Sequence, residues 1–356
     1  MIPSSNSNSL PLTISNKTSL DRLSGMELLR IIAMFLVLVV HSCFFSVGAP
    51  SHDEIVSHFP SSFTRIFFQS LSIGCVDLFV LLSGWFGIRP KVESICRFVF
   101  QCLFFLIGIY AVCVATGLSD INWKGIAGCF LLLKWNWFIK AYLLLYILCP
   151  VLNAFIDSAS RKQFLMVLVG FFIFQTVYSW GTDAAEFFKA GYSTISFIGL
   201  YMLARYVAIF KPRILAHRRE VYLAFFFVSV MLMAIAYYLA SYFSIGGIMR
   251  RIFRYDQPLV IISALSLVVY FSKMDFKSKA VNWVASSSFA VFLFHTNPNL
   301  CKQYFVPTIK WLYNTFNGVS CLSHIMLFLV LVFGISILLD QPRKFLWNKV
   351  EGVFFR

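Results

Sequence analysis

Long apolar stretches alternate with short polar segments along nearly the whole chain. Each apolar stretch is close to the ~20 residues that an α-helix needs to cross the hydrocarbon core of a membrane. The pattern therefore predicts an all-α protein, a polytopic transmembrane helix bundle with about ten spans. We expect these spans at residues 26–47, 68–88, 95–117, 137–156, 163–180, 193–210, 221–243, 257–272, 283–299 and 322–340.

The remaining segments are short, so we expect no separate soluble domain. Residues 1–20 are rich in Ser, Asn and Thr, and no basic start leads into a short apolar core, which predicts a polar, disordered tail rather than a signal peptide. Residues 125–133 are apolar but too short to span, which suggests a re-entrant piece. We expect the membrane domain over residues 21–345 and a short basic cytoplasmic tail over residues 346–356.

The charge of the chain supports this topology. The 30 Lys and Arg residues against 15 Asp and Glu give a formal charge of +15, which in a soluble protein would point to nucleic acid. A composition that is 59% hydrophobic and only 13% charged excludes a soluble protein. With the N-terminus inside, 18 of the cations fall on the inner side and 9 on the outer side. This bias predicts that both termini are cytoplasmic, that the protein lies in the cell (inner) membrane, and that nucleic acid is not a partner.

Cysteine and histidine usage points to neither a disulfide framework nor a metal site. The nine cysteines are an odd number, form no C-x-x-C pair, and mostly lie in or beside apolar runs. We interpret them as small hydrophobic residues of a membrane protein. The histidines outside the spans lack the spacing of metal ligands, so we expect no metal site.

The first span carries ionisable residues at helical spacing. Arg30 and His41 are eleven positions apart, which places them on one helix face about 16 Å apart along the axis. Glu27 precedes Arg30 by three positions and shares this face. A neutral imidazole accepts a proton near pH 7, so His41 is a candidate base. The alternative is a histidine that only hydrogen-bonds a neighbouring helix.

The second span places a carboxylate in apolar sequence. Asp77 could orient a base or pair with an arginine at a site, or it could form a purely structural ion pair. Ser83 and Gly84 allow another backbone or a ligand to approach closely. We therefore expect Glu27, Asp77, Ser83 and Gly84 to support or orient the site.

Polar and aromatic residues gather at the predicted outer ends of two later spans. Trp137 and Lys140 could bind a sugar, or they could belong to the belt that anchors helices at the interface. His295 and Asn297 make the ninth span polar for lipid, although a helix-ending turn explains the Asn-Pro sequence equally well. We treat all four as candidate acceptor-binding residues.

Three arginines break the charge bias on the predicted outer side. Arg250, Arg251 and Arg254 lie in one loop where few cations are expected. A bound ligand or an inward fold would explain them, and so would a misplaced span boundary. We include them among the candidate acceptor-binding residues.

Three blocks in order resemble the membrane acyltransferase-3 family. They are Arg30 followed after ten residues by His41, the stretch VDLFVLLSGWFGI, and the late FLFHTNP. The stretch WFIKAYLLLYILCPVLNAF is similar to members that modify cell-surface polysaccharides. The resemblance implies ten core spans and the transfer of an acyl group, usually acetyl, from cytoplasmic acyl-CoA to a sugar hydroxyl on the far side.

The resemblance also implies roles for particular residues. His41 would be the catalytic base or a transient acyl acceptor, and Arg30 would help to hold the donor. The family's pair of arginines three apart is replaced here by Arg89 and Arg97, which are candidate donor-binding residues. Acyl-CoA would be a co-substrate, a carbohydrate the acceptor, and no cofactor would be bound permanently. The alternative function is a carrier or flippase for lipid-linked sugars or anions, which polar intramembrane residues would also suit.

Overall fold

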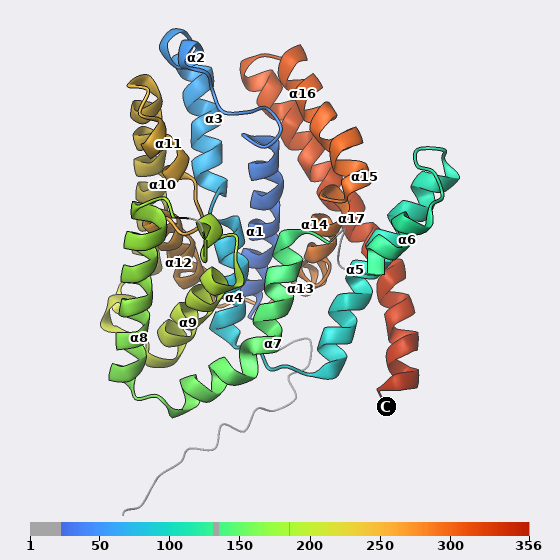
Figure 1. The fold of residues 1–356 in the computed structure, drawn as a ribbon, viewed down its shortest axis with the longest axis horizontal. Coiled ribbons are helices and arrows are strands. Elements are labelled where there is room, and N and C mark those ends of the chain that lie inside the picture. The colour runs from blue at the N-terminus through green and yellow to red at the C-terminus, as the bar shows by residue number, and fades with distance from the viewer. Residues whose placement is uncertain (1–22, 131–134, 185, 356) are drawn as a thin grey trace, which may run out of the picture.

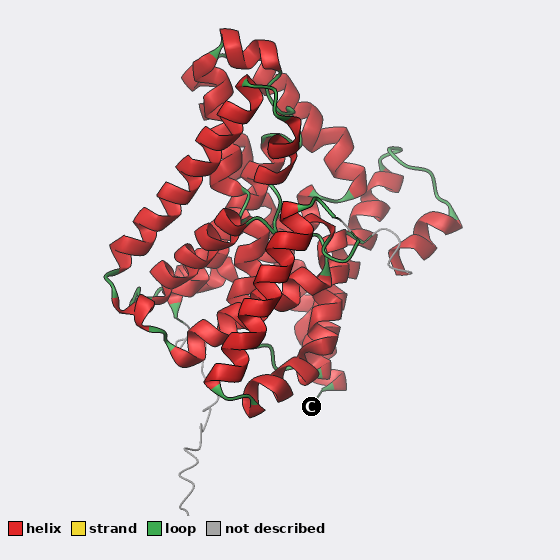
Figure 2. Ribbon diagram, turned by 60° about the vertical axis from the view of Figure 1, so that its left-hand side comes forward, coloured by secondary structure: helices red, strands yellow, loops and turns green. Residues whose placement is uncertain are grey.

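The computed structural model describes residues 23–130, 135–184 and 186–355 (Figure 1). Within these ranges every regular element is a helix, which confirms the all-α prediction (Figure 2). The longer helices are α1 (Ser24–Ser42), α3 (Phe59–Ser72), α4 (Cys75–Phe86), α5 (Val92–Ala115), α7 (Trp137–Ser158), α8 (Arg161–Phe174), α9 (Thr194–Phe210), α10 (Arg219–Tyr242), α12 (Pro258–Ser272), α16 (Val306–Thr315) and α17 (Gly318–Phe354). The shorter ones are α2 (His52–Ser57), α6 (Trp123–Phe130), η2 (Gln175–Gly181), η3 (Lys189–Gly191), η4 (Arg213–Ala216), α11 (Gly246–Ile252), α13 (Lys279–Ala285), α14 (Ser288–His295), α15 (Pro298–Leu300) and η5 (Cys301–Phe305).

Seven helical segments of the described chain are long and apolar enough to cross a membrane. They are Ser24–Ser42, Phe59–Phe86, Val92–Ala115, Trp137–Ser158, Arg161–Gly181, Arg219–Tyr242 and Gly318–Phe354. Two further predicted spans coincide with the shorter apolar helices α9 and α12. The predicted span at 283–299 is divided between α13 and α14. A multi-pass membrane protein is therefore supported, whereas the count of ten and the side of the termini stay predictions.

Two predicted boundaries were wrong. The second span begins at Phe59 instead of residue 68, because polar residues such as Thr64 and Arg65 interrupt the apolar pattern but lie within α3. The last span extends from Gly318 to Phe354, so the helix runs through most of the segment expected to be a tail. Residues 1–20 lie outside the described residues, and so does part of the apolar piece at 125–133, whose first residues belong to α6.

Helix α4 lies at the centre of the bundle, where α1, α9 and α12 pack against it. The contact with α9 is close because Gly84 has no side chain. A Cβ atom at Gly84 would lie 2.5 Å from the carbonyl oxygen of Tyr201. Helix α14 packs against α1 and α17, which brings its C-terminal residues close to α1. All nine cysteines are described and free, and seven of them are buried, as expected for small hydrophobic residues.

In Figure 1 the two ends of the bundle are easily distinguished. We call the end that carries α2, α11 and α16 the upper end, and the end that carries the α7–α8 turn and the C-terminus the lower end. Under the predicted topology the upper end would face outward and the lower end the cytoplasm.

Candidate active site

A cavity of about 520 Å³ lies inside the bundle beside α1. Met34, Val37 and His41 line it from α1, at positions three and four residues apart on one helix face. The cavity thus follows α1 for about 10 Å, at a rise of about 1.5 Å per residue. His41 lies on the upper part of this wall, and the predicted face of α1 is the face that lines the cavity.

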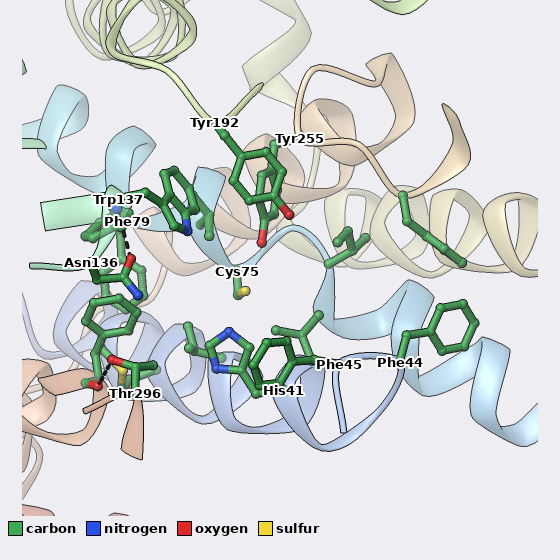
Figure 3. A pocket seen from close by; sticks show the side chains of 18 of the residues that line it. His41, Phe44, Phe45, Cys75, Phe79, Asn136, Trp137, Tyr192, Tyr255 and Thr296 are labelled. Carbon is green, nitrogen blue, oxygen red and sulfur yellow. Dashed lines mark hydrogen bonds between the residues drawn. The ribbon is translucent and has the colours of Figure 1, made fainter. Parts of the chain in front are cut away.

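An aromatic cluster of Trp137, Tyr192 and Tyr255 forms the wall opposite His41 (Figure 3). The ring centroids of Trp137 and Tyr192 are 4.5 Å apart, and those of Tyr192 and Tyr255 are 4.7 Å apart. Tyr192 and Tyr255 meet because Gly191, whose φ is +91°, lets the backbone pack against Tyr255. Asn136 caps α7 by accepting a hydrogen bond from the N–H of Phe138 and also lines the cavity. The structure thus brings Trp137 to the cavity of His41.

His41 and His295 form an imidazole pair. Nδ1 of His41 lies 2.8 Å from Nε2 of His295, and Nδ1 of His295 lies 2.5 Å from the carbonyl oxygen of Val291. A carbonyl oxygen only accepts hydrogen bonds, so Nδ1 of His295 carries a proton. When both rings are neutral, Nε2 of His295 must accept and Nδ1 of His41 must donate. In this arrangement, Nε2 of His41 keeps a free lone pair, which can accept a proton or attack a carbonyl carbon.

His295 therefore has a different place from the one predicted. It is only 2% exposed and does not line the cavity of His41. The structure moves His295 from the acceptor-binding group to the imidazole pair. Sequence reasoning missed this pairing because 254 positions separate the two residues, and only the packing of α14 against α1 brings them together.

Arg30 and Glu27 form an ion pair below the cavity. Nη1 of Arg30 lies 2.6 Å from a carboxylate oxygen of Glu27. Helix α1 is unbroken from Ser24 to Ser42, so the predicted axial separation of about 16 Å between Arg30 and His41 holds. The side chain of Arg30 is 33% exposed, which leaves the guanidinium accessible from the lower end.

Ser83 and Gly84 support the site through packing. The hydroxyl of Ser83 donates to the carbonyl oxygen of Phe79 and lies 2.9 Å from the hydroxyl of Tyr142. Neither residue lines the cavity, and Gly84 instead packs against α9. They hold α4 in place between α7 and α9.

Asp77 neither orients His41 nor pairs with an arginine. It is fully buried, and both carboxylate oxygens lack a hydrogen-bond partner among the described residues. Cys75, Val76 and Phe79 line the cavity from α4, and the 100° rotation per residue places Asp77 on the opposite face of that helix. The predicted pairing was wrong because the sequence does not indicate which face of α4 meets α1.

None of the three outer arginines lines the cavity of His41, and two of them, Arg250 and Arg254, share Asp183 as an ion-pair partner. Arg254 is buried and bonds Asp256 at 2.7 Å, Asp183 at 2.5 Å and the hydroxyl of Ser179 at 2.8 Å. This network joins η2 to the segment before α12, so Arg254 stabilises the fold instead of lining the cavity. The side chain of Arg250 is 70% exposed, and that of Arg251 also lies outside the cavity lining.

Other candidate residues lie apart from the cavity. Lys140 is exposed, so its position fits an interface anchor. Asn297 caps α15 by accepting from the N–H of Asn299, as the helix-ending alternative predicted. Arg89 is exposed in the segment after α4, and Arg97 forms ion pairs with two glutamates, Glu93 and Glu351.

Arg205 is a cation near the lower end that the site prediction did not include. It lies on α9 beside Gly87, where a Cβ atom would be 3.0 Å from Nη1 of Arg205. Gly87 has a φ of +77°, so the chain turns sharply at the end of α4. Nε of Arg205 is buried and has no partner in the described structure. Its position within an apolar span was the signal that could have identified it.

The fold and site define a helical membrane protein with a histidine pair beside an internal cavity. The family model described as an acyltransferase domain matches residues 23–340, which is most of the chain. The protein therefore belongs to the acyltransferase-3 family and is a membrane acyltransferase. Searches of curated proteins and of solved structures gave no significant match.

Proposed function

We propose that this protein transfers an acetyl group from cytoplasmic acetyl-CoA to a hydroxyl of a cell-surface polysaccharide or lipid-linked sugar, within the cell membrane. The observation that carries the proposal is the imidazole pair. His295 supports the tautomer of His41 whose free Nε2 faces a cavity large enough for a reacting group. Family membership identifies the reaction as acyl transfer, and His41 is the residue of the site that would carry it out.

The donor would enter from the lower end. Arg30 is accessible there, and Arg205 has an unpaired N–H near the end of α4. Guanidinium groups bind phosphate through paired hydrogen bonds, so these two arginines would hold the phosphates of CoA. The thioester arm would then extend along the face of α1 past Met34 towards His41.

Two routes to the product use the same residues. In the base route, Nε2 of His41 removes the proton of the sugar hydroxyl as the oxygen attacks the thioester carbonyl. The carbon–sulfur bond breaks, and His41 returns the proton to the thiolate. In the acyl-histidine route, Nε2 attacks the thioester carbonyl first, the carbon–sulfur bond breaks, and CoA leaves as the thiolate while Nδ1 releases its proton to His295. The sugar oxygen then attacks the acyl carbon, the bond to Nε2 breaks, and His295 returns its proton to Nδ1. The hydroxyl proton passes to water and balances the proton that the thiolate takes up.

The acceptor would bind near the upper part of the cavity. The aromatic cluster offers ring faces for a sugar, and the amide of Asn136 offers hydrogen bonds to hydroxyl groups. An apolar wall with a few polar groups is typical of small-molecule sites. Arg254, held in its own ion-pair network, has no part in this proposal.

An exchange assay tests the proposal and separates the two routes. Purified protein in liposomes is mixed with acetyl-CoA and labelled CoA, with and without polysaccharide extracted from the producing cells. Exchange of label into acetyl-CoA without acceptor would identify the acyl-histidine route, whereas transfer only with acceptor would identify the base route. General base catalysis contributes about 10²–10⁴-fold, so His41→Ala should reduce turnover at least 100-fold.

The matched control is His324→Ala. His324 is an exposed histidine near the start of α17 and lies outside the cavity. The His324→Ala variant should leave turnover unchanged. A folded His41→Ala protein with normal acetyl transfer would refute the proposed function.

A further inference from the structure

A second cavity, of about 550 Å³, lies on the side of α1 away from the imidazole pair. Residues of α1, α3, α16 and α17 line it, and none of them lines the cavity of His41. Ser42 and Cys43, which follow His41 directly, line this second cavity. The end of α1 thus separates the two cavities.

Arg65 is the only charged side chain that lines the second cavity within the described chain. Its side chain is 8% exposed, and its Nε is buried without a hydrogen-bond partner. The ring of Tyr313 lies 5.4 Å from the guanidinium carbon and holds the group by a cation–π contact. A buried guanidinium with an unused N–H is a costly arrangement unless an anionic group completes it.

Glu54 pairs with Arg65 but satisfies only part of the guanidinium. A carboxylate oxygen of Glu54 lies 2.9 Å from Nη2, and its side chain is 40% exposed at the edge of the bundle. Burial raises the pKa of Glu54, but the backbone N–H of Ser51 and the charge of Arg65 outweigh this effect and hold the pKa below its usual value. The pair fixes the position of Arg65 and leaves Nε available.

The rest of the cavity is polar at the upper end and apolar below. Ser61, Thr64 and Asn317 lie near the starts of α3 and α17. Leu322, Ile325, Met326 and Leu329 continue along one face of α17 over about 10 Å. One cation at an interface, followed by an apolar channel at membrane depth, complements a molecule with a phosphate at one end and a hydrocarbon chain at the other.

We propose that this cavity binds a phospholipid of the surrounding bilayer, with the phosphate on Arg65 and one acyl chain along α17. The proposal is independent of acyl transfer, because no residue of the imidazole pair takes part. Arg65 serves here as a phosphate ligand whose N–H groups are already oriented by Glu54 and Tyr313.

The test compares lipids that share their chains and differ in the phosphate. The protein is placed in nanodiscs that contain equal amounts of dioleoyl-phosphatidylglycerol and dioleoylglycerol, and the lipid retained per protein is counted by native mass spectrometry. We expect at least tenfold preference for the phospholipid, the effect of one charge-assisted hydrogen bond. Soluble glycerol 3-phosphate at equal concentration should not displace it, because it lacks the chain.

Three variants complete the test. Arg65→Gln should lower retention of the phospholipid roughly tenfold or more. Cys321→Trp would fill the cavity without touching the Arg65–Glu54 pair, so it should abolish retention and decides the question if Arg65→Gln fails to fold. Lys124→Gln removes one exposed cation from α6 and should bind lipid like the wild type.

Several results would overturn the proposal. These are unchanged retention in both Arg65→Gln and Cys321→Trp, equal retention of dioleoylglycerol, or displacement of the lipid by glycerol 3-phosphate. Binding of a polyprenyl phosphate in place of phosphatidylglycerol would show that the occupant is a lipid carrier and would overturn the assignment to a bilayer phospholipid.

Discussion

Replacing His295 by alanine should slow acetyl transfer by roughly 10- to 100-fold. The change removes the acceptor that holds the proton on Nδ1 of His41 at 2.8 Å. One neutral hydrogen bond is worth about 0.5–1.5 kcal/mol, or roughly 2- to 13-fold in rate. Losing the fixed tautomer and ring orientation of His41 reduces the rate further. For comparison, mutating the hydrogen-bond partner of a metal-bound histidine typically reduces activity or metal affinity by about 10- to 100-fold.

The assay measures kcat and KM for acetyl-CoA, normalised to folded protein. His295→Ala should lower kcat with little change in KM, because His295 does not line the donor path. His295→Gln should recover much of the loss, since its amide oxygen can accept the proton on Nδ1 of His41. His295 also lines a third cavity, of about 690 Å³, so added imidazole should enter it and restore part of the rate of His295→Ala.

The double variant tests whether the two histidines act as a unit. His41→Ala with His295→Ala should be no slower than His41→Ala alone, because a positioning residue has no effect once its target is gone. The reasoning fails if His295→Ala keeps the wild-type kcat. It also fails if the losses of the two single variants simply multiply.

Three further predictions follow from packing and charge. Gly84→Val should lower the melting temperature through a clash costing about 1–3 kcal/mol, whereas Gly170→Ala, with open space at its Cβ, should not. Arg205→Gln should raise KM roughly tenfold for acetyl-CoA but not for acetyl-pantetheine, which lacks the nucleotide phosphates, and equal effects on both donors would exclude a phosphate contact. Arg343→Met should destabilise the protein by about 3–5 kcal/mol in a thermal unfolding assay, because it leaves the fully buried Asp340 without its cation at 2.7 Å; an unchanged melting temperature would contradict this.

The regular features of this fold could be predicted from the sequence. Apolar length identified most of the long helices, although not α16, and helical periodicity placed Arg30 and His41 on the same side of α1. These features depend on residues close in the chain, within one helix. The start of α3 was missed because a helix buried in a bundle tolerates polar residues such as Arg65 that reduce its average hydropathy.

The site itself depended on contacts between distant helices. His295 reaches His41 only through the packing of α14 on α1, and no local pattern indicates that contact. Asp77 lies on the face of α4 away from the cavity, which depends on how α4 rotates between its neighbours. Arg254 pairs not only with the neighbouring Asp256 but also with Asp183, which is 71 positions earlier in the chain. The sequence therefore indicates which residue types are costly in a membrane, but not which of them meet.

The most direct test of the central claim is acetyl transfer by the purified protein in liposomes. Labelled acetyl-CoA is supplied on one side and polysaccharide from the producing cells on the other, and covalent label on the sugar is measured for the wild type, His41→Ala and His324→Ala. The account predicts labelled sugar with the wild type and His324→Ala, and at least a 100-fold loss with His41→Ala. Movement of sugar across the membrane without covalent label, or full labelling by a folded His41→Ala protein, would contradict it.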